Sequence, residues 1–219
     1  PYQDNGIKFF DREGGKLSDA IEAAIEARLE SPAVTRESSQ LGRAKRVDNA
    51  LQSYQNFCIS TVPPELRLDG LKIVIDCSHG AAYKVAPRVL TDLGAEIVPI
   101  GCSPNGRNIN DGCGSMKPEL LQLTTTGVRA DLGVALDGDG DRLLMADHTG
   151  ALVDGDQLLW VLASAWKKSG ELRGPVVGTL MSNFGLERGL NELGIEFLRA
   201  KVGDRYVLEL LREKGGRLG

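Results

Sequence analysis

The amino-acid sequence predicts an α/β protein made of repeated βαβ modules, with mixed sheets and flanking helices. Three observations support this fold class. From residue 71 onward, short apolar runs of strand length alternate with segments whose apolar residues recur at helical spacing. Glycine, aspartate and asparagine follow the ends of the apolar runs, as is typical of turns. A second, weaker copy of the pattern begins at Val176 and is incomplete.

The first sixty residues predict one short strand and two helices. Apolar residues recur at helical spacing between Leu17 and Leu29, with Ser18 placed to cap the helix and a Ser-Pro pair to end it. The polar run that follows is expected to form a loop. The other elements predicted here are a strand over Ile7–Phe10 and a helix over Val47–Ile59, with a module boundary at Pro63-Pro64.

Strands and helices alternate through the rest of the chain. The predicted strands are Leu71–Asp76, Glu96–Ile100, Asp131–Leu136, Leu143–Ala146, Val176–Thr179 and Glu196–Leu198. The predicted helices are Ala81–Leu93, one that starts near Pro118, Leu158–Lys168 and Phe184–Leu193. In such a fold, functional loops are expected at the carboxyl ends of the strands.

Composition excludes several classes of protein. The 219 residues contain 26 basic and 30 acidic side chains, a net charge of −4 that argues against a nucleic-acid or anionic membrane surface as the main partner. The longest apolar stretch, near Leu158–Trp166, is far short of the roughly 20 residues of a membrane span. No leader for secretion opens the sequence, and the four cysteines lack CxxC spacing. Reduced thiols and a cytoplasmic location are therefore expected.

The sharpest local signal is a run of three aspartates, Asp137, Asp139 and Asp141, separated only by glycines. Glycine allows a tight loop that can turn the three carboxylates toward one centre, where they would repel one another without a cation. A hard divalent cation such as Mg²⁺ takes oxygen ligands and leaves coordination positions for a phosphate. Arg142 follows directly, and its guanidinium can orient phosphate oxygens. The run therefore predicts a metal site next to a phosphate site.

Two other interpretations of the acidic run are weaker. Acidic Asp-Gly runs are common in exposed turns, but here apolar strands flank the run closely on both sides. A calcium EF-hand needs glycine at its sixth position and glutamate at its twelfth, where this sequence has Arg142 and His148. We therefore reject the EF-hand.

Other residues carry weaker signals. Lys8 follows a tight turn on a predicted strand, although a strand lysine is usually a solvated surface group. His79 lies in a strand-end turn and is expected to be an exposed loop residue, since no second histidine close in sequence completes a zinc site. Cys77 is expected to pack rather than react. The Asp154-Gly155-Asp156 run is typical of the entry to a helix.

Taken together, five segments resemble the α-D-phosphohexomutase superfamily, and the closest likeness is to its bacterial phosphoglucosamine mutase branch. The resemblance extends over the whole chain. In the phosphomannomutase and phosphoglucomutase branches the last of the five segments carries a histidine after its glycine, where this chain has Asp204. The five segments are Pro1–Phe10, Asn105–Asn110, Asp137–Arg142, Gly178–Asn183 and Lys201–Val207.

The resemblance implies an enzyme, an intramolecular phosphotransferase that interconverts glucosamine 6-phosphate and glucosamine 1-phosphate with Mg²⁺ as its cofactor. A phosphoserine donates its phosphoryl group and the sugar passes through a bisphosphate, on the route to UDP-N-acetylglucosamine and peptidoglycan. Asp137, Asp139 and Asp141 are then the metal ligands. Arg142 supports the phosphate, and Lys8 is a candidate general acid–base or phosphate contact. The implied partners are a hexosamine phosphate and a sugar bisphosphate, with a homodimer as one option for assembly.

The resemblance also implies how the chain is divided. Residues 1–50 correspond to the C-terminal part of domain I, residues 51–152 to domain II with the metal-binding loop, and residues 153–219 to the first part of domain III. The phosphoserine segment and the sugar-recognition loop of the family have no counterpart in this sequence. The chain alone is therefore expected to bind Mg²⁺ weakly and to turn over nothing. The alternatives are a phosphoglucomutase or phosphomannomutase, and a non-catalytic module that binds Mg²⁺ or a sugar phosphate.

Overall fold

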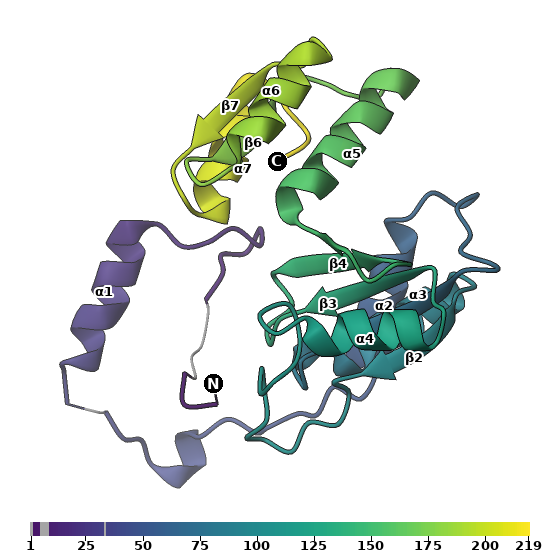
Figure 1. Ribbon diagram of the computed structural model, residues 1–219. Coiled ribbons are helices and arrows are strands. Elements are labelled where there is room, and N and C mark those ends of the chain that lie inside the picture. Colours follow the sequence, from purple (N-terminus) through teal and green to yellow (C-terminus); the bar gives the residue numbers. More distant parts are fainter. Residues whose placement is uncertain (1, 5–8, 33) are drawn as a thin grey trace. The chain divides into compact units, whose positions relative to one another are not determined.

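The strands that the sequence predicts between residues 71 and 147 form one mixed sheet in the computed structural model of the chain (Figure 1). The sheet has five strands in the order β2-β1-β3-β4-β5. β1 pairs in parallel with both β2 and β3, whereas the pairs β3–β4 and β4–β5 are antiparallel. The strands are β1 (Lys72–Asp76), β2 (Glu96–Ile100), β3 (Leu132–Leu136), β4 (Leu143–Asp147) and β5 (Leu152–Val153).

The structure describes residues 2–4, 9–32 and 34–219. The chain divides into two units, one formed by residues 3–51 and the other mainly by residues 52–219. The first unit contains helix α1 (Asp19–Leu29) and a 3₁₀ turn, Ser38–Gln40, and none of the α1 residues is buried. Ser18 is the N-cap of α1, as expected, but its side chain makes no capping hydrogen bond. Most of the strand predicted before α1 lies outside the described residues, and Phe10 forms an isolated bridge with Lys16.

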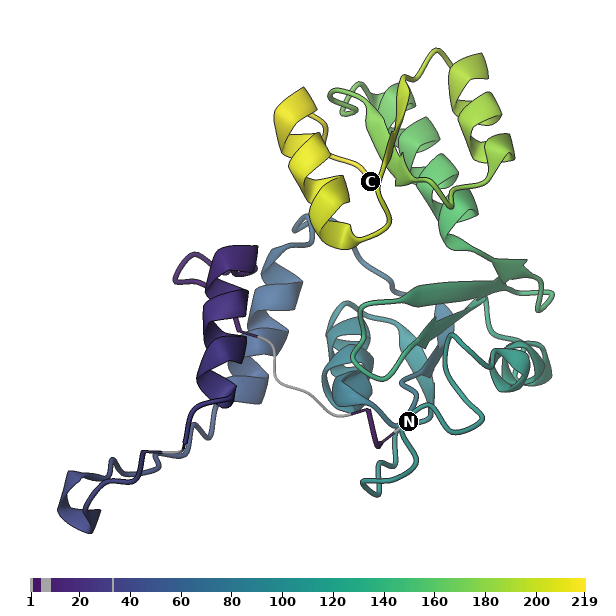
Figure 2. The same ribbon diagram turned by 90° about the vertical axis from the view of Figure 1, so that its left-hand side faces the viewer.

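Helices lie on both faces of the five-stranded sheet, as the views in Figures 1 and 2 show for α3 (Val85–Asp92) and α4 (Glu119–Gly127). α4 packs against β1, β3 and β4, and α3 packs against β2. Pro99 lies in β2, an edge strand, where a missing N–H is tolerated. Helix α2 (Ala50–Ser60) precedes the sheet, and the Gln55 side chain donates a hydrogen bond of 2.5 Å to Asp92 at the end of α3. The buried core between α4 and the sheet is formed by Val74, Leu121, Ala130, Ala135 and Ala146.

The C-terminal part of the second unit has its own small sheet and core. β6 (Val176–Thr179) pairs in parallel with β7 (Phe197–Ala200). Helix α5 (Gly155–Ser169) begins with a capping box between Asp154 and Gln157, so the helix entry predicted at Asp154 is confirmed. The helix itself starts three residues before Leu158, its predicted start. The other two helices are α6 (Phe184–Glu192) and α7 (Asp204–Lys214). The core consists of Ala163, Val176, Leu186, Leu190, Ile195 and Leu218.

The structure corrects two predictions of secondary structure and adds two elements. The single helix predicted over Ala81–Leu93 is wrong: the segment forms a 3₁₀ turn, Ala81–Tyr83, and then α3. Pro87 explains the break, because proline has no N–H to donate inside a helix and is tolerated only in the first turn, where α3 places it. The helix predicted from Val47 begins at Ala50. Helix α7 and the two-residue strand β5 were not predicted.

None of the helices in the described part of the chain combines the length and apolar character that crossing a membrane requires.

Candidate metal centre

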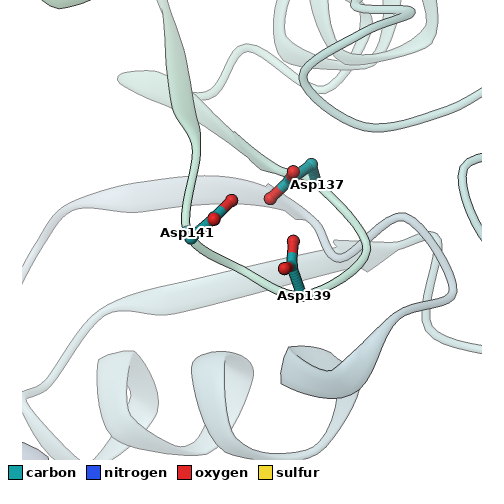
Figure 3. Close-up of side chains that lie close together, drawn as sticks. All are labelled: Asp137, Asp139 and Asp141. Atoms are coloured by element: carbon teal, nitrogen blue, oxygen red, sulfur yellow. The ribbon is translucent and has the colours of Figure 1, made fainter. Parts of the chain in front are cut away.

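The acidic loop joins β3 to β4 and lies at the carboxyl end of β3. The last ladder pair of this hairpin is Leu136 with Leu143. Inside the loop, the Gly140 N–H donates to the Asp137 carbonyl at 3.2 Å. Gly140 has a φ of +74°, a conformation that glycine adopts at little cost. The loop is therefore tight, and it turns the three carboxylates toward one another (Figure 3).

The three carboxylates form a compact cluster. One oxygen each of Asp137, Asp139 and Asp141 lie within 4.8 Å of one another. Asp137 is buried, with 2 % of its surface exposed, whereas the other two are exposed. Two oxygens on opposite sides of a Mg²⁺ ion are about 4.2 Å apart, twice the usual bond length. Adjacent oxygens on such an ion are about 3.0 Å apart. Small side-chain rotations would bring the three oxygens to these spacings, so the cluster fits a hard divalent cation.

Electrostatics of the loop also favour a cation. Desolvation raises the pKa of Asp141, and the neighbouring charges of Asp137 and Asp139 raise it further. Arg142 acts in the opposite direction on the same pKa. Mutual repulsion of this kind is what a bound divalent cation offsets.

Arg142 closes the cluster from one side. Its Nε lies 3.0 Å from Oδ2 of Asp137 and 3.7 Å from Oδ1 of Asp141. Its main-chain N–H also donates to Oδ1 of Asp137 at 3.1 Å. The Arg142 side chain is two-thirds exposed, so its guanidinium remains accessible to an anion such as a phosphate while it compensates the aspartates. An arginine suits both roles, access to an anion and compensation of the aspartates.

A second loop, which follows β1, lies directly against the acidic loop. The Ala81 N–H donates to the Gly138 carbonyl at 2.8 Å. At Gly80, a Cβ atom would lie 2.2 Å from the same carbonyl oxygen, a distance that no real Cβ contact shows. Only glycine therefore allows the two backbones to approach this closely. The sequence pattern predicts this turn at a strand end, but its contact with the acidic loop is visible only in the structure.

Three other residues that the sequence singled out are His79, Cys77 and Lys8. His79 is half-buried rather than exposed, has a φ of +51°, and accepts a hydrogen bond at Nδ1 from the Ser103 N–H at 3.1 Å. Cys77 is fully buried, and desolvation strongly raises the pKa of its thiol, so it packs as expected. Lys8 lies outside the described residues.

Asp76 and Ser78 were not predicted as site residues, and the structure buries both completely. Asp76 accepts hydrogen bonds from the loops that follow β1 and β2, and the Ser78 hydroxyl donates to Leu136 at the end of β3. Their position at the end of a predicted strand was the available signal.

Two models of one protein family match the chain. The phosphoglucomutase/phosphomannomutase alpha/beta/alpha domain II matches residues 51–150, and domain III of the same family matches residues 154–219. Over all 219 residues the chain is 57 % identical to a phosphoglucosamine mutase of Aeromonas hydrophila and 58 % identical to one of Photorhabdus laumondii. The chain spans about half of these curated relatives, 49 % of the length of each.

A solved structure shares the fold. The chain superimposes on a putative phosphomannomutase from Thermus thermophilus with a TM-score of 0.71 and 19 % identity, over 91 % of this chain and 46 % of that one. At this level of identity the likeness concerns the fold alone.

Proposed function

Because this chain belongs to the phosphoglucomutase/phosphomannomutase family of α-D-phosphohexomutases, we propose that it carries the metal centre of a phosphoglucosamine mutase. The proposed reaction is the interconversion of glucosamine 6-phosphate and glucosamine 1-phosphate through a bisphosphate. The observation that carries this proposal is the converging triad of Asp137, Asp139 and Asp141 in a chain 57 % identical throughout to a phosphoglucosamine mutase. The same identity supports the division into the end of domain I, domain II and the start of domain III.

The triad is proposed to hold Mg²⁺. The arrangement suits this role because the buried carboxylate, Asp137, is held by Arg142, while the other two carboxylates are exposed on the open side of the loop. A bound Mg²⁺ would withdraw charge from the oxygens of the phosphoryl group in transfer. Phosphoryl transfer depends mainly on positioning and on charge stabilisation, which are the properties that this loop supplies.

Arg142 and Lys8 are proposed to act on the phosphate. Arg142 already contacts two members of the triad, so its guanidinium lies beside the position that a phosphate on the cation would take. Lys8 remains a candidate for general acid–base catalysis or for a phosphate contact, on the resemblance of its segment alone. A hexosamine phosphate, a sugar bisphosphate and a second copy of the protein are the proposed partners.

A cytoplasmic location is part of the proposal. The proposed substrates are phosphorylated sugars, whose charges keep them inside the cell. All four cysteines are free, and two of them are buried, which agrees with a reducing compartment.

The experiment that tests this function is a turnover panel. It uses a protein that carries this sequence and spans the full length of the curated relatives, with Mg²⁺ and a bisphosphate activator. The substrates are glucosamine 1-phosphate, glucose 1-phosphate and mannose 1-phosphate. We expect a preference for the glucosamine ester of about tenfold or more in kcat/KM, which corresponds to about 1.4 kcal/mol in the transition state.

The same panel separates the alternative functions. An equal or reversed preference would favour a phosphoglucomutase or phosphomannomutase. Binding of Mg²⁺ without turnover of any ester would instead favour a non-catalytic sugar-phosphate module.

A further inference from the structure

A network of buried hydrogen bonds adjoins the acidic loop and begins at Asp76, the last residue of β1. Asp76 is fully buried. Its Oδ1 accepts a hydrogen bond from the Ser78 N–H at 2.9 Å, and its Oδ2 accepts one from the Gly114 N–H at 2.8 Å. Within the described ranges, no basic side chain forms a salt bridge with it. Because burial of a carboxylate without such donors is costly, Asp76 holds in place the two loops that supply them, one after β1 and one after β2.

Ser78 is held from three directions. Its N–H is bound by Asp76, its carbonyl accepts a hydrogen bond from the Asn110 N–H at 2.9 Å, and its hydroxyl donates to the Leu136 carbonyl. Ser78 has a φ of +53°, which is uncommon for a residue other than glycine. Backbone strain of this kind persists only where the surroundings determine it, and it is frequent at functional sites.

The acceptor of the Ser78 hydroxyl directly precedes the acidic cluster. The carbonyl of Leu136 and the N–H of Asp137 belong to one planar peptide group. A hydrogen bond to that carbonyl therefore sets the plane from which the Asp137 side chain projects. The same carbonyl accepts a second hydrogen bond from the Ser115 N–H at 3.1 Å. Loss of the Ser78 hydroxyl would loosen this peptide group without releasing it.

We propose that Ser78 is a positioning residue for the cation site, which it serves by fixing the peptide group between Leu136 and Asp137. This inference rests on the proposed function, because it takes the three aspartates as cation ligands. Ser78 itself is fully buried, and its hydroxyl donates to the Leu136 carbonyl, which directly precedes the ligand loop. Its effect is therefore expected on cation affinity, and it acts through Asp137.

The test compares serine-to-alanine variants of the two serines that donate hydrogen bonds to the Leu136 carbonyl. Ser78→Ala removes the hydroxyl that donates to Leu136. Ser115→Ala is the matched control, because the Ser115 hydroxyl is buried without a hydrogen-bond partner and its main-chain N–H is retained. Binding of Mn²⁺, a hard cation that takes the same oxygen ligands, is measured on the 219-residue chain from the electron paramagnetic resonance signal of the free ion. We expect Ser78→Ala to raise the Kd at least fivefold and Ser115→Ala to change it less than twofold.

A third variant separates affinity from stability. Ser78→Gly also lacks the hydroxyl, but it relaxes the left-handed backbone at this position. We expect it to unfold at a urea concentration equal to or above that of Ser78→Ala and yet to bind Mn²⁺ as weakly. If the role of Ser78 were purely structural, Ser78→Gly would instead recover Mn²⁺ affinity together with stability. If circular dichroism shows both Ser78 variants unfolded, Ser78 is a folding residue and the proposal is wrong.

Asp139→Asn distinguishes failure of this inference from failure of the proposed function. Suppose that the unmodified chain binds Mn²⁺ and that Asp139→Asn loses this binding. If both Ser78 variants then bind Mn²⁺ as tightly as the unmodified chain, only the role of Ser78 is overturned. The chain alone is expected to bind the cation weakly, so Mn²⁺ is added in the millimolar range. If the unmodified chain shows no binding even there, or Asp139→Asn binds Mn²⁺ equally well, the cation site itself is overturned and the inference with it.

Discussion

Replacement of Gly80 by alanine is expected to destabilise the chain by about 2–4 kcal/mol and to weaken cation binding at the acidic loop. The new Cβ would lie 2.2, 2.6 and 2.7 Å from the carbonyl oxygen, Cα and carbonyl carbon of Gly138. All three are backbone atoms, so no side chain can rotate away. Ordinary contacts are about 3.5–4.0 Å, and the two loops must therefore separate by roughly 1 Å or more.

The magnitude follows from two contributions. Insertion of a methyl group into a packed site costs about 1–3 kcal/mol. The separation also breaks the 2.8 Å hydrogen bond from the Ala81 N–H to the Gly138 carbonyl, and a hydrogen bond of this kind contributes about 1 kcal/mol. Because Gly138 lies between two of the aspartates, the same displacement is expected to raise the Kd for Mn²⁺.

Urea unfolding at 25 °C measures the stability change, and Mn²⁺ binding measures the second effect. The matched control is Gly155→Ala in the first turn of α5, where a Cβ would meet nothing within 4 Å. Alanine favours a helix over glycine by about 1 kcal/mol, so the control is expected to be neutral or slightly stabilising. A Gly80→Ala variant within about 0.5 kcal/mol of the unmodified chain, with unchanged Mn²⁺ affinity, would refute the reasoning about the loop contact.

Three further predictions concern single side chains. Asp139→Asn should weaken Mn²⁺ binding at least tenfold by calorimetry, whereas Asp111→Asn, an exposed acid in a neighbouring loop, should leave it unchanged. Asp154→Ala removes the capping box with Gln157 at the start of α5 and should cost about 1 kcal/mol in urea unfolding; no loss would mean that the cap is unimportant. Desolvation raises the pKa of Cys113 to about 11, so the thiolate fraction at about pH 8 is roughly 100-fold lower in the folded chain than in concentrated urea, and iodoacetamide should label this thiol more slowly by about that factor. The raised pKa stabilises the folded state fully below about pH 9, and this stabilisation is lost as the pH rises through about 11. Equal labelling rates would contradict the raised pKa.

Local patterns in the sequence predicted much of the fold. β2 and β6 have the predicted bounds because a glycine or a polar residue closes each apolar run. The helix predicted over Ala81–Leu93 was wrong because Pro87 favours a start only two residues before it. Helix α7 was missed although Val207, Leu210 and Leu211 follow helical spacing, since charged residues dominate the segment.

The candidate site divides in the same way. The convergence of the three aspartates depends only on a tight hairpin loop, so their spacing was sufficient to predict it. The support from Asp76 and Ser78 depends on contacts between loops that are distant in sequence. Ser78 and Leu136 are 58 positions apart and meet because β1 and β3 are neighbouring strands. Strand order is a property of the whole sheet, and no local pattern in the sequence contains it.

An anomalous difference map from crystals of the chain grown with Mn²⁺ would locate the cation directly. We expect one strong peak between the carboxylates of Asp137, Asp139 and Asp141, with Mn–O distances of about 2.1–2.2 Å, close to those of Mg²⁺. The same crystals of Asp139→Asn should lose the peak. A strong peak elsewhere with none at the triad, at Mn²⁺ concentrations that saturate binding in solution, would contradict the assignment of this loop as the metal centre.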